Sequence, residues 1–184
     1  VERSRGLGDV YKRQPVIDAL IKDGRLIAGS RADIGRSGLG LAVRTGTPKP
    51  DISSVDAFKR TLLAAKAVAY PGKGASGLYF VSLLDRLGIK AGMQGKLKPM
   101  EAEDTVEVVA RGEADMVVVV ATRITGVPGV DLVGPIPGEL QTKIGFSAGL
   151  SASAKEREAA QALIRFLTAP AAGPTLKANG VDPA

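Results

Sequence analysis

Apolar residues recur along the chain at two spacings, which predict helices and strands in turn. Helical spacing occurs in six stretches, at residues 15–24, 53–63, 77–88, 103–111, 153–167 and 170–180. Short apolar runs bounded by glycine, proline or polar residues predict six strands, at residues 39–43, 67–70, 96–100, 114–121, 130–133 and 144–150. Since the two kinds of element alternate throughout, the sequence predicts an α/β fold.

Several of these elements carry end signals. Ser53 or Ser54 is placed to cap the second helix, and Ser153 with Glu156 has the spacing of a capping box. The run Met116–Ala121 has no polar residue, which is typical of a strand covered on both faces, as in a parallel sheet. The segment TPKPDI at 47–52 has two prolines and is expected to be an extended connector.

The composition removes several function classes. The 184 residues include no cysteine and no histidine, which excludes disulfide scaffolds, zinc sites of the usual kind and Ser-His-Asp catalysis. The longest apolar run is far shorter than the ~20 residues of a membrane span, so no span is expected. The net charge of +6 is compatible with an anionic ligand. Lysine and arginine are dispersed and aromatic residues are few, so no nucleic-acid partner is expected.

The first fourteen residues, VERSRGLGDVYKRQ, differ from the rest. They show no apolar periodicity, and the string GDVYKRQ resembles translated sequencing-adapter read-through. A helical pattern starts abruptly at Pro15. We therefore expect residues 1–14 to be a non-native tail without tertiary contacts.

The segment Tyr70–Tyr79 has the arrangement of an anion site. A strand ends at Tyr70, the turn PGKGASG follows, and Ser76 with Gly77 opens a helix. Backbone N–H groups at a helix start are unpaired donors, and the helix dipole attracts anions. Ser76 adds a hydroxyl, and small residues such as Ala75 and Gly77 let a ligand approach the backbone. From the residues alone, the alternative that Ser76 only caps its own helix is the commoner case.

Other candidate motifs fail on spacing. PGKGASG lacks the GxxxxGK[ST] of a P-loop, and GRSGLG at 35–40 precedes a strand and does not join a strand to a helix. The acidic residues Glu101, Glu103, Asp104 and Glu107 are most simply the solvated start of a helix. The sequence therefore predicts no catalytic residue, no metal site and no cofactor.

Five runs of sequence after residue 14, taken in their order and spacing, form a pattern that can be compared with known families. They are PVIDALIKDGRLIAGSRADIGRSGLGLAVRTGTPKPDISSVDAFKRTLLAAKAVAY at 15–70, ASGLYFVSLLDRLGI at 75–89, VARGEADM at 109–116, VPGVDLVGPIPGELQ at 127–141 and FSAGLSASAKEREAAQALIRFLTAPAA at 146–172. Together they resemble the periplasmic solute-binding proteins of ABC importers, in the branch similar to molybdate-binding proteins.

This resemblance implies a type II periplasmic-binding fold, in which two α/β lobes joined by two crossing strands close over a ligand by a hinge motion. On that map, residues 15–45 and 141–184 form the first lobe and residues 46–140 the second. The family's N-terminal strand-helix-strand has no counterpart in this chain. The first lobe is therefore expected to be incomplete, with apolar residues such as Leu39, Leu41, Val43 and Phe166 uncovered.

The resemblance also implies a function. The protein would be a non-enzymatic, periplasmic monomer that captures a small anion, such as molybdate, and delivers it to the permease of an ABC transporter. Ser76, Gly77 and Ala75 would hold the ligand, with Tyr70, Ala121 and Thr122 as further candidates. Arg36 and Ser37, just before a crossing strand, are weaker ones. One departure affects the substrate: Val117–Val120 stand where relatives of this branch often carry glutamine.

Two rival functions stay open at this point. The effector-sensing domain of a bacterial transcription regulator uses the same fold and would carry a helix-turn-helix segment upstream. An enzyme on a related two-lobed scaffold is the other rival, and it lacks support because no acid/base constellation appears among residues that include no histidine or cysteine.

Overall fold

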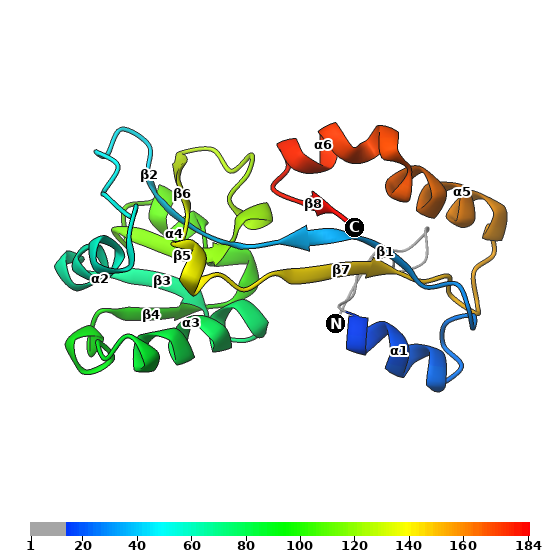
Figure 1. Ribbon diagram of the computed structural model, residues 1–184, viewed down its shortest axis with the longest axis horizontal. Coiled ribbons are helices and arrows are strands. Elements are labelled where there is room, and N and C mark those ends of the chain that lie inside the picture. The colour runs from blue at the N-terminus through cyan, green and yellow to red at the C-terminus, as the bar shows by residue number, and fades with distance from the viewer. Residues whose placement is uncertain (1–13) are drawn as a thin grey trace. The chain divides into compact units, whose positions relative to one another are not determined.

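The chain folds into two compact α/β units in the computed structural model, which describes residues 14–184 (Figure 1). Unit 1 comprises the described residues up to Ser37 together with Ile144–Ala184, and unit 2 comprises Gly38–Lys143. The division therefore falls at residues 37/38 and 143/144, not near 45 and 140. The expected tail lies outside the described residues except for Gln14, which begins the first helix.

Helices and strands alternate as the pattern predicted. The strands are β1 Ala32–Ser37, β2 Leu39–Arg44, β3 Val68–Pro71, β4 Leu97–Met100, β5 Met116–Val120, β6 Val130–Pro135, β7 Ile144–Ala148 and β8 Asp182–Pro183. The helices are α1 Gln14–Lys22, α2 Val55–Ala64, α3 Ala75–Arg86, α4 Glu107–Ala110, α5 Arg157–Thr168 and α6 Gly173–Ala178. Short 3-10 turns are η1 Ala91–Met93, η2 Ala102–Asp104, η3 Ala121–Arg123, η4 Gly138–Leu140 and η5 Pro170–Ala172.

Unit 2 is built on a five-stranded sheet with the order β4-β3-β5-β2-β6. Strands β4, β3 and β5 run parallel, whereas β2 pairs antiparallel with both β5 and β6. The sheet is thus mixed, and the expectation of a parallel environment for the valine run holds only on the β3 side of β5. Because β2 is the fourth strand of this sheet, it belongs to unit 2, which is why the boundary precedes residue 39.

The faces of this sheet are covered by helices. Val117 and Val119 pack in one core cluster with Val106, the N-cap of α4, and with Val109, which lies within α4. Neighbouring positions on a strand point to the opposite face, so Met116 and Val118 face away from α4. Helix α3 contacts β3 and β5 and buries Phe80, Leu83 and Leu84 completely.

Unit 1 has a three-stranded antiparallel sheet with the order β7-β1-β8. Helix α5 contacts β1, and Ile164 packs there against Ile34 and Ala148. Helix α1 contacts β7, and α6 contacts β8. Phe166 on α5 is 65% exposed, as expected, but the expectation was wrong for Leu39, Leu41 and Val43, which are buried inside unit 2.

Some local predictions were wrong for identifiable reasons. The helix expected at 103–111 is split into η2 and the four-residue α4. Ser153 does not cap α5, because its hydroxyl pairs with that of Ser151 at 3.0 Å and the helix starts only after Glu156. Strands β1 and β8 were not predicted, since ADIGRS and Asp182–Pro183 show no apolar alternation. Ser54 does cap α2, where its hydroxyl accepts the Ala57 N–H at 3.1 Å.

Candidate functional site

The parallel strands of unit 2 bring three chain segments to one edge of the sheet. Strand β3 leads into the glycine-rich turn and α3, β4 leads into η2, and β5 leads into η3. Because carboxyl ends of parallel strands meet at the same edge, these three segments lie together there. The antiparallel β2 starts at this edge, where Leu39 pairs with Val120. Ligands of open α/β sheets bind at such an edge.

The turn between β3 and α3 depends on its glycines. Gly74 occupies the N-cap position of α3 with a φ of 97°, in the left-handed region that favours glycine. At Gly77, an added Cβ would overlap the carbonyl oxygen of Pro71, so the helix start packs directly on the end of β3. The N–H of Gly72 donates to the carbonyl of Met100 at 2.8 Å, which ties the turn to β4.

Ser76 has no structural task in its own helix. It is the second residue of α3, the N-cap is Gly74, and no side chain caps this helix, so the interpretation of Ser76 as a cap is wrong. The residue is only 6% exposed, and among the described residues its hydroxyl has no hydrogen-bond partner. The Ser76 hydroxyl is not among the fully buried polar atoms that lack a partner, so it remains accessible to water or to a ligand.

Backbone donors lie beside this hydroxyl. The first hydrogen bond of α3 runs from the Leu78 N–H to the Gly74 carbonyl at 3.1 Å. The N–H groups of Ala75, Ser76 and Gly77 therefore have no acceptor within the helix. Three N–H groups and one hydroxyl at the positive end of a twelve-residue helix can bind an oxyanion.

Charged groups near this helix start are exposed. Lys73, in the turn, forms an ion pair with Glu101 after β4 at 2.9 Å, and the hydrogen bond to Glu101 raises the pKa of Lys73. Both side chains are mostly in solvent, so the pair adds little stability. Arg123 of η3 donates to the carbonyl of Ala102, which joins the segments after β4 and β5. These pairings across the edge had no sequence signal, because the partners are far apart in the chain.

The other predicted site residues fare differently. Tyr70 is half-buried at the end of β3, and its ring packs on Phe80 with a centroid distance of 5.6 Å. Thr122, in η3 at the same edge, is half-buried and has no hydrogen bond among the described residues. Ala121 was predicted as a backbone contact, and this was wrong for its N–H, which donates to the Gly38 carbonyl at 2.9 Å.

Arg36 and Ser37 belong to the other unit. Both lie on β1, where the Arg36 side chain is exposed and Ser37 is buried. The structure thus brings Ser76, Gly77 and Ala75 together in one turn, and it places Thr122 and Ala121 on the same sheet edge of unit 2.

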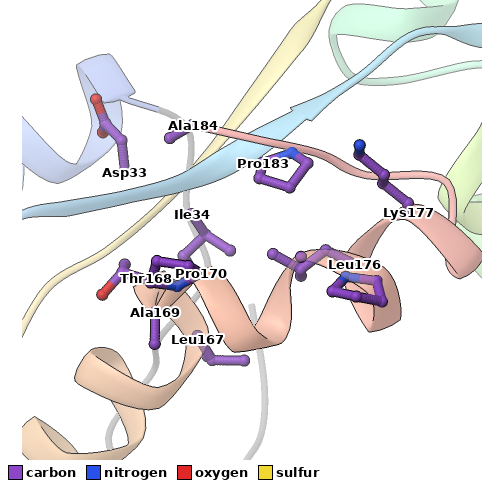
Figure 2. A pocket seen from close by; sticks show the side chains of 12 residues that line it. Asp33, Ile34, Leu167, Thr168, Ala169, Pro170, Leu176, Lys177, Pro183 and Ala184 are labelled. Carbon is purple, nitrogen blue, oxygen red and sulfur yellow. The ribbon is translucent and has the colours of Figure 1, made fainter.

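Unit 1 contains a separate pocket of about 580 Å³ between its sheet and its C-terminal helices (Figure 2). Ile34, Leu167 and Leu176 line it, together with prolines of the C-terminal segment, and Lys177 and Asp33 are its charged residues. None of the predicted site residues lines this pocket, and its apolar wall offers few donors to an anion.

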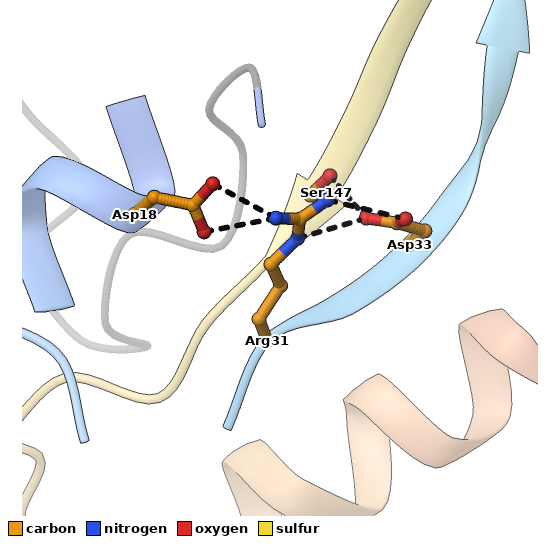
Figure 3. Close-up of polar contacts among 4 residues, drawn as sticks. All are labelled: Asp18, Arg31, Asp33 and Ser147. Carbon is orange, nitrogen blue, oxygen red and sulfur yellow. Dashed lines mark hydrogen bonds and ion pairs between the residues drawn. The ribbon is translucent and has the colours of Figure 1, made fainter. Parts of the chain in front are cut away.

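A polar cluster joins α1, β1 and β7 in unit 1 (Figure 3). Arg31 lies between two carboxylates: its Nη1 is 2.8 Å from Asp18 Oδ1, and its Nε is 3.2 Å from Asp33 Oδ1. Asp33 also accepts a hydrogen bond of 2.7 Å from the buried Ser147 hydroxyl. The hydrogen bonds to Asp33 and Asp18 raise the pKa of Arg31. Because its guanidinium is paired with both carboxylates, Arg31 links α1 to β1.

The described part of the chain contains no cluster of three or more acidic side chains that would hold a metal ion. None of its helices is long and apolar enough to cross a membrane.

The sequence matches one family model over most of its length. The family is described as bacterial extracellular solute-binding protein, and the match covers residues 11–182. A relative from Pseudomonas sp, an aconitate isomerase, is 38% identical over 168 residues. That alignment covers 91% of this chain and 64% of the relative, so the chain spans somewhat less than two thirds of the relative's length.

Solved structures share the fold at low sequence identity. The periplasmic molybdate-binding protein of Azotobacter vinelandii superposes with a TM-score of 0.72 at 19% identity, over 92% of this chain and 74% of that protein. The substrate-binding domain of a molybdenum ABC transporter from Clostridium difficile gives a TM-score of 0.68 at 18% identity, over 93% and 74% of the two chains. These likenesses support the α/β binding-protein fold.

Proposed function

We propose that this chain, which belongs to the family of bacterial extracellular solute-binding proteins, captures a small oxyanion such as molybdate for an ABC transporter permease in the periplasm. The observation that carries this proposal is the start of α3. There the hydroxyl of Ser76, which has no hydrogen-bond partner among the described residues, lies beside three backbone N–H groups without helical acceptors. The fold shared with a molybdate-binding protein and with a molybdenum transporter domain supports molybdate as the first anion to test.

The mechanism follows from the chemistry of these donors. A fully deprotonated tetrahedral oxyanion such as molybdate or sulfate only accepts hydrogen bonds and needs several donors that converge on it. Ser76 and the N–H groups of residues 75–77 supply them, and the helix dipole adds a favourable field. The bound anion then favours the conformation that holds it best, and the permease recognises that conformation.

The test is a calorimetric titration of the protein with molybdate, tungstate, sulfate and phosphate. At least one anion is expected to bind, and Ser76→Ala should weaken that binding roughly tenfold to a hundredfold by removing one hydrogen bond to a charged group. The control is Ser82→Ala, since the Ser82 hydroxyl donates to the Tyr79 carbonyl at 2.7 Å on the same helix, away from its start. Binding by no anion, or unchanged affinity in Ser76→Ala, contradicts the proposal.

A second variant tests the backbone donors. Ala75 is the first residue of α3, where proline is well accepted because its fixed φ suits a helix start. Ala75→Pro removes one N–H and should also weaken anion binding. Proline at Gly77 is unsuitable, because any Cβ there would overlap the Pro71 carbonyl oxygen. An affinity for the best-binding anion that stays unchanged in Ala75→Pro would show that this N–H does not touch the ligand.

A second candidate function is isomerisation of aconitate. The observation that favours it is the 38% identity to an aconitate isomerase over 91% of this chain. Aconitate is a carboxylate anion, so the same helix start would bind one of its carboxylates, and catalysis would need a further group that moves a proton. Incubation with cis-aconitate, followed by proton NMR of the olefinic signal, separates the two functions: new isomer signals indicate the enzyme, and binding without turnover indicates the solute-binding protein.

A further inference from the structure

The pocket of unit 1 lies over the core of that unit (Figure 2). Ile34 of β1 packs there with Ala148 and Ile164 in a buried cluster. Leu167 of α5 and Leu176 of α6 pack against this cluster, remain half-buried and line the pocket. A ligand with an apolar body therefore removes apolar surface of both helices from water, which is the main source of affinity in pockets with apolar walls.

Prolines limit the hydrogen bonds that this wall can offer. Pro170, Pro174 and Pro183 line the pocket, and none of them has a backbone N–H. The Thr168 hydroxyl, on the same wall, donates to the Ile164 carbonyl within α5 at 2.9 Å. The wall therefore suits the hydrocarbon part of a ligand and not a polar part.

Two charged residues line the pocket, and their surroundings differ. Asp33 accepts hydrogen bonds from the Ser147 hydroxyl at 2.7 Å and from Arg31 Nε at 3.2 Å, so its carboxylate is turned toward those partners (Figure 3). Lys177 lies at the opposite side of the pocket in Figure 2, and it is exposed. Among the described residues, its ammonium has no ion pair and no hydrogen bond. The pocket therefore presents a positive charge at the end that is remote from Asp33.

We propose that this pocket is a second binding site, which takes a small monocarboxylate with an apolar body, such as a medium-chain fatty acid. The hydrocarbon part lies against Leu167 and Leu176, and the carboxylate lies beside the ammonium of Lys177. The reverse orientation places the carboxylate near Asp33, where the two negative charges repel each other. The volume of about 580 Å³ is in the range of pockets that hold small organic molecules. The proposal goes beyond the anion site at α3, because every residue that lines this pocket belongs to unit 1.

A molecule in this pocket also fastens the C-terminal segment to unit 1. Strand β8 consists of Asp182 and Pro183 alone, which pair with Arg36 and Gly35 of β1. Helix α6 has only six residues. Because the pocket is lined by β8, α6 and the end of α5, its ligand contacts all three elements. A ligand that binds only this folded arrangement stabilises the protein by mass action.

Octanoate is the probe for the test, and octan-1-ol is its neutral counterpart with the same chain length. Methyl NMR of the whole protein locates the site. Octanoate should shift the methyl signals of Ile34, Leu167 and Leu176 in a saturable way, and it should leave those of Leu78 on α3 unchanged. The melting temperature should rise with the octanoate concentration.

Two variants test the two parts of the site. Gly173→Leu places a side chain in the pocket, and its Cβ position meets only Pro183 Cγ within 4 Å, at an ordinary contact distance of 3.7 Å. This variant should abolish saturable binding. Lys177→Gln should weaken octanoate binding roughly two- to fivefold, to the level of octan-1-ol, whereas Lys177→Arg should keep it. The control is Lys155→Gln, an exposed lysine of unit 1 that does not line the pocket, and it should bind octanoate as the parent does.

Methyl shifts that are absent, or that grow without saturation, overturn the proposal, and so does octanoate binding that is unchanged in Gly173→Leu. Equal affinity of the parent for octanoate and octan-1-ol, without a loss in Lys177→Gln, contradicts the assignment of a carboxylate ligand. If Gly173→Leu does not fold, the methyl shifts and the Lys177 variants decide. Ser76→Ala should leave octanoate binding unchanged, and Gly173→Leu should leave molybdate binding unchanged, so the failure of one site is distinguishable from the failure of the other.

Discussion

The Cα of Gly77 rests against the carbonyl oxygen of Pro71, closely enough that a Cβ at residue 77 would overlap that oxygen. The contact is between two stretches of backbone, the start of α3 and the end of β3, so no side-chain rotation relieves it. The unpaired N–H groups of the helix start are thereby fixed relative to the sheet edge.

Gly77→Ala should therefore destabilise the protein by about 1–3 kcal/mol, because the helix start must move away from β3. Thermal unfolding followed by circular dichroism measures the effect, and Gly138→Ala, whose Cβ meets no atom within 4 Å, is the matched control. A melting temperature equal to that of the control would show that the start of α3 can move away from β3 at no cost in stability, against this prediction.

The serines at two helix starts should respond differently to substitution. Ser54→Ala removes the cap of α2 and is expected to cost about 1 kcal/mol of stability. Ser76→Ala removes no hydrogen bond within the described protein, so its melting temperature without ligand should stay close to that of the parent. A drop in Ser76→Ala as large as that in Ser54→Ala would mean that the Ser76 hydroxyl has a structural partner after all.

The two carboxylates around Arg31 should also differ. Asp33→Ala leaves the buried Ser147 hydroxyl without this acceptor and is expected to cost roughly 1–3 kcal/mol. Asp18→Ala breaks only a largely exposed ion pair and is expected to cost about 0–1 kcal/mol. Chemical denaturation of both variants measures the difference, and equal losses would refute the assignment of the main role to Asp33.

Acid should weaken the fold through two surface carboxylates. Hydrogen bonds from Ser53 lower the pKa of Asp51, and the hydrogen bond from Arg111 lowers the pKa of Glu113. Their folded pKa values lie below the unfolded ones, so their contribution to stability is present above about pH 4 and is lost as the pH falls through the folded values. The melting temperature should thus decline below about pH 4.

Asp51→Asn should make this decline shallower, because one of the two groups no longer titrates. The control is Glu103→Gln, an exposed carboxylate with no hydrogen bond or ion pair among the described residues. Melting temperatures of both variants are measured across the acid range. If the melting temperature of Asp51→Asn falls as steeply as that of the control, Asp51 does not contribute to the acid sensitivity.

Hydrophobic pattern and glycine placement were enough to predict most elements of this fold. The run Leu39–Val43 and the valines after Met116 are central strands because only a buried strand accommodates such residues. The turn PGKGASG was predicted between a strand and a helix, where the structure has it. What could not be predicted depended on distant partners. The strand β1 exists because ADIGRS pairs with β7 more than a hundred residues later, and its own sequence is mostly polar or small.

The local structure around the candidate site residues was predicted more closely than their hydrogen bonds were. Ser76 was placed correctly beside the helix start, yet its exact position relative to the cap depends on the left-handed Gly74, which moves the start of the helix to Ala75. The Ala121 N–H seemed available because nothing in the local sequence shows that the Gly38 carbonyl, more than eighty residues earlier, accepts it.

The division of the chain into two units has a consequence for its assembly, because unit 2 is one uninterrupted segment set within the sequence of unit 1. Near the two ends of this segment, the Leu39 N–H donates to Gln141 Oε1 at 2.9 Å, so the segment begins and ends at neighbouring points. A segment whose two ends meet can be spliced into a single surface loop of a host, and the entropy of closing that loop changes only slowly with the length inserted. We therefore expect unit 2 to be replaceable by a related segment, while the sheet of unit 1 keeps its own strand pairing.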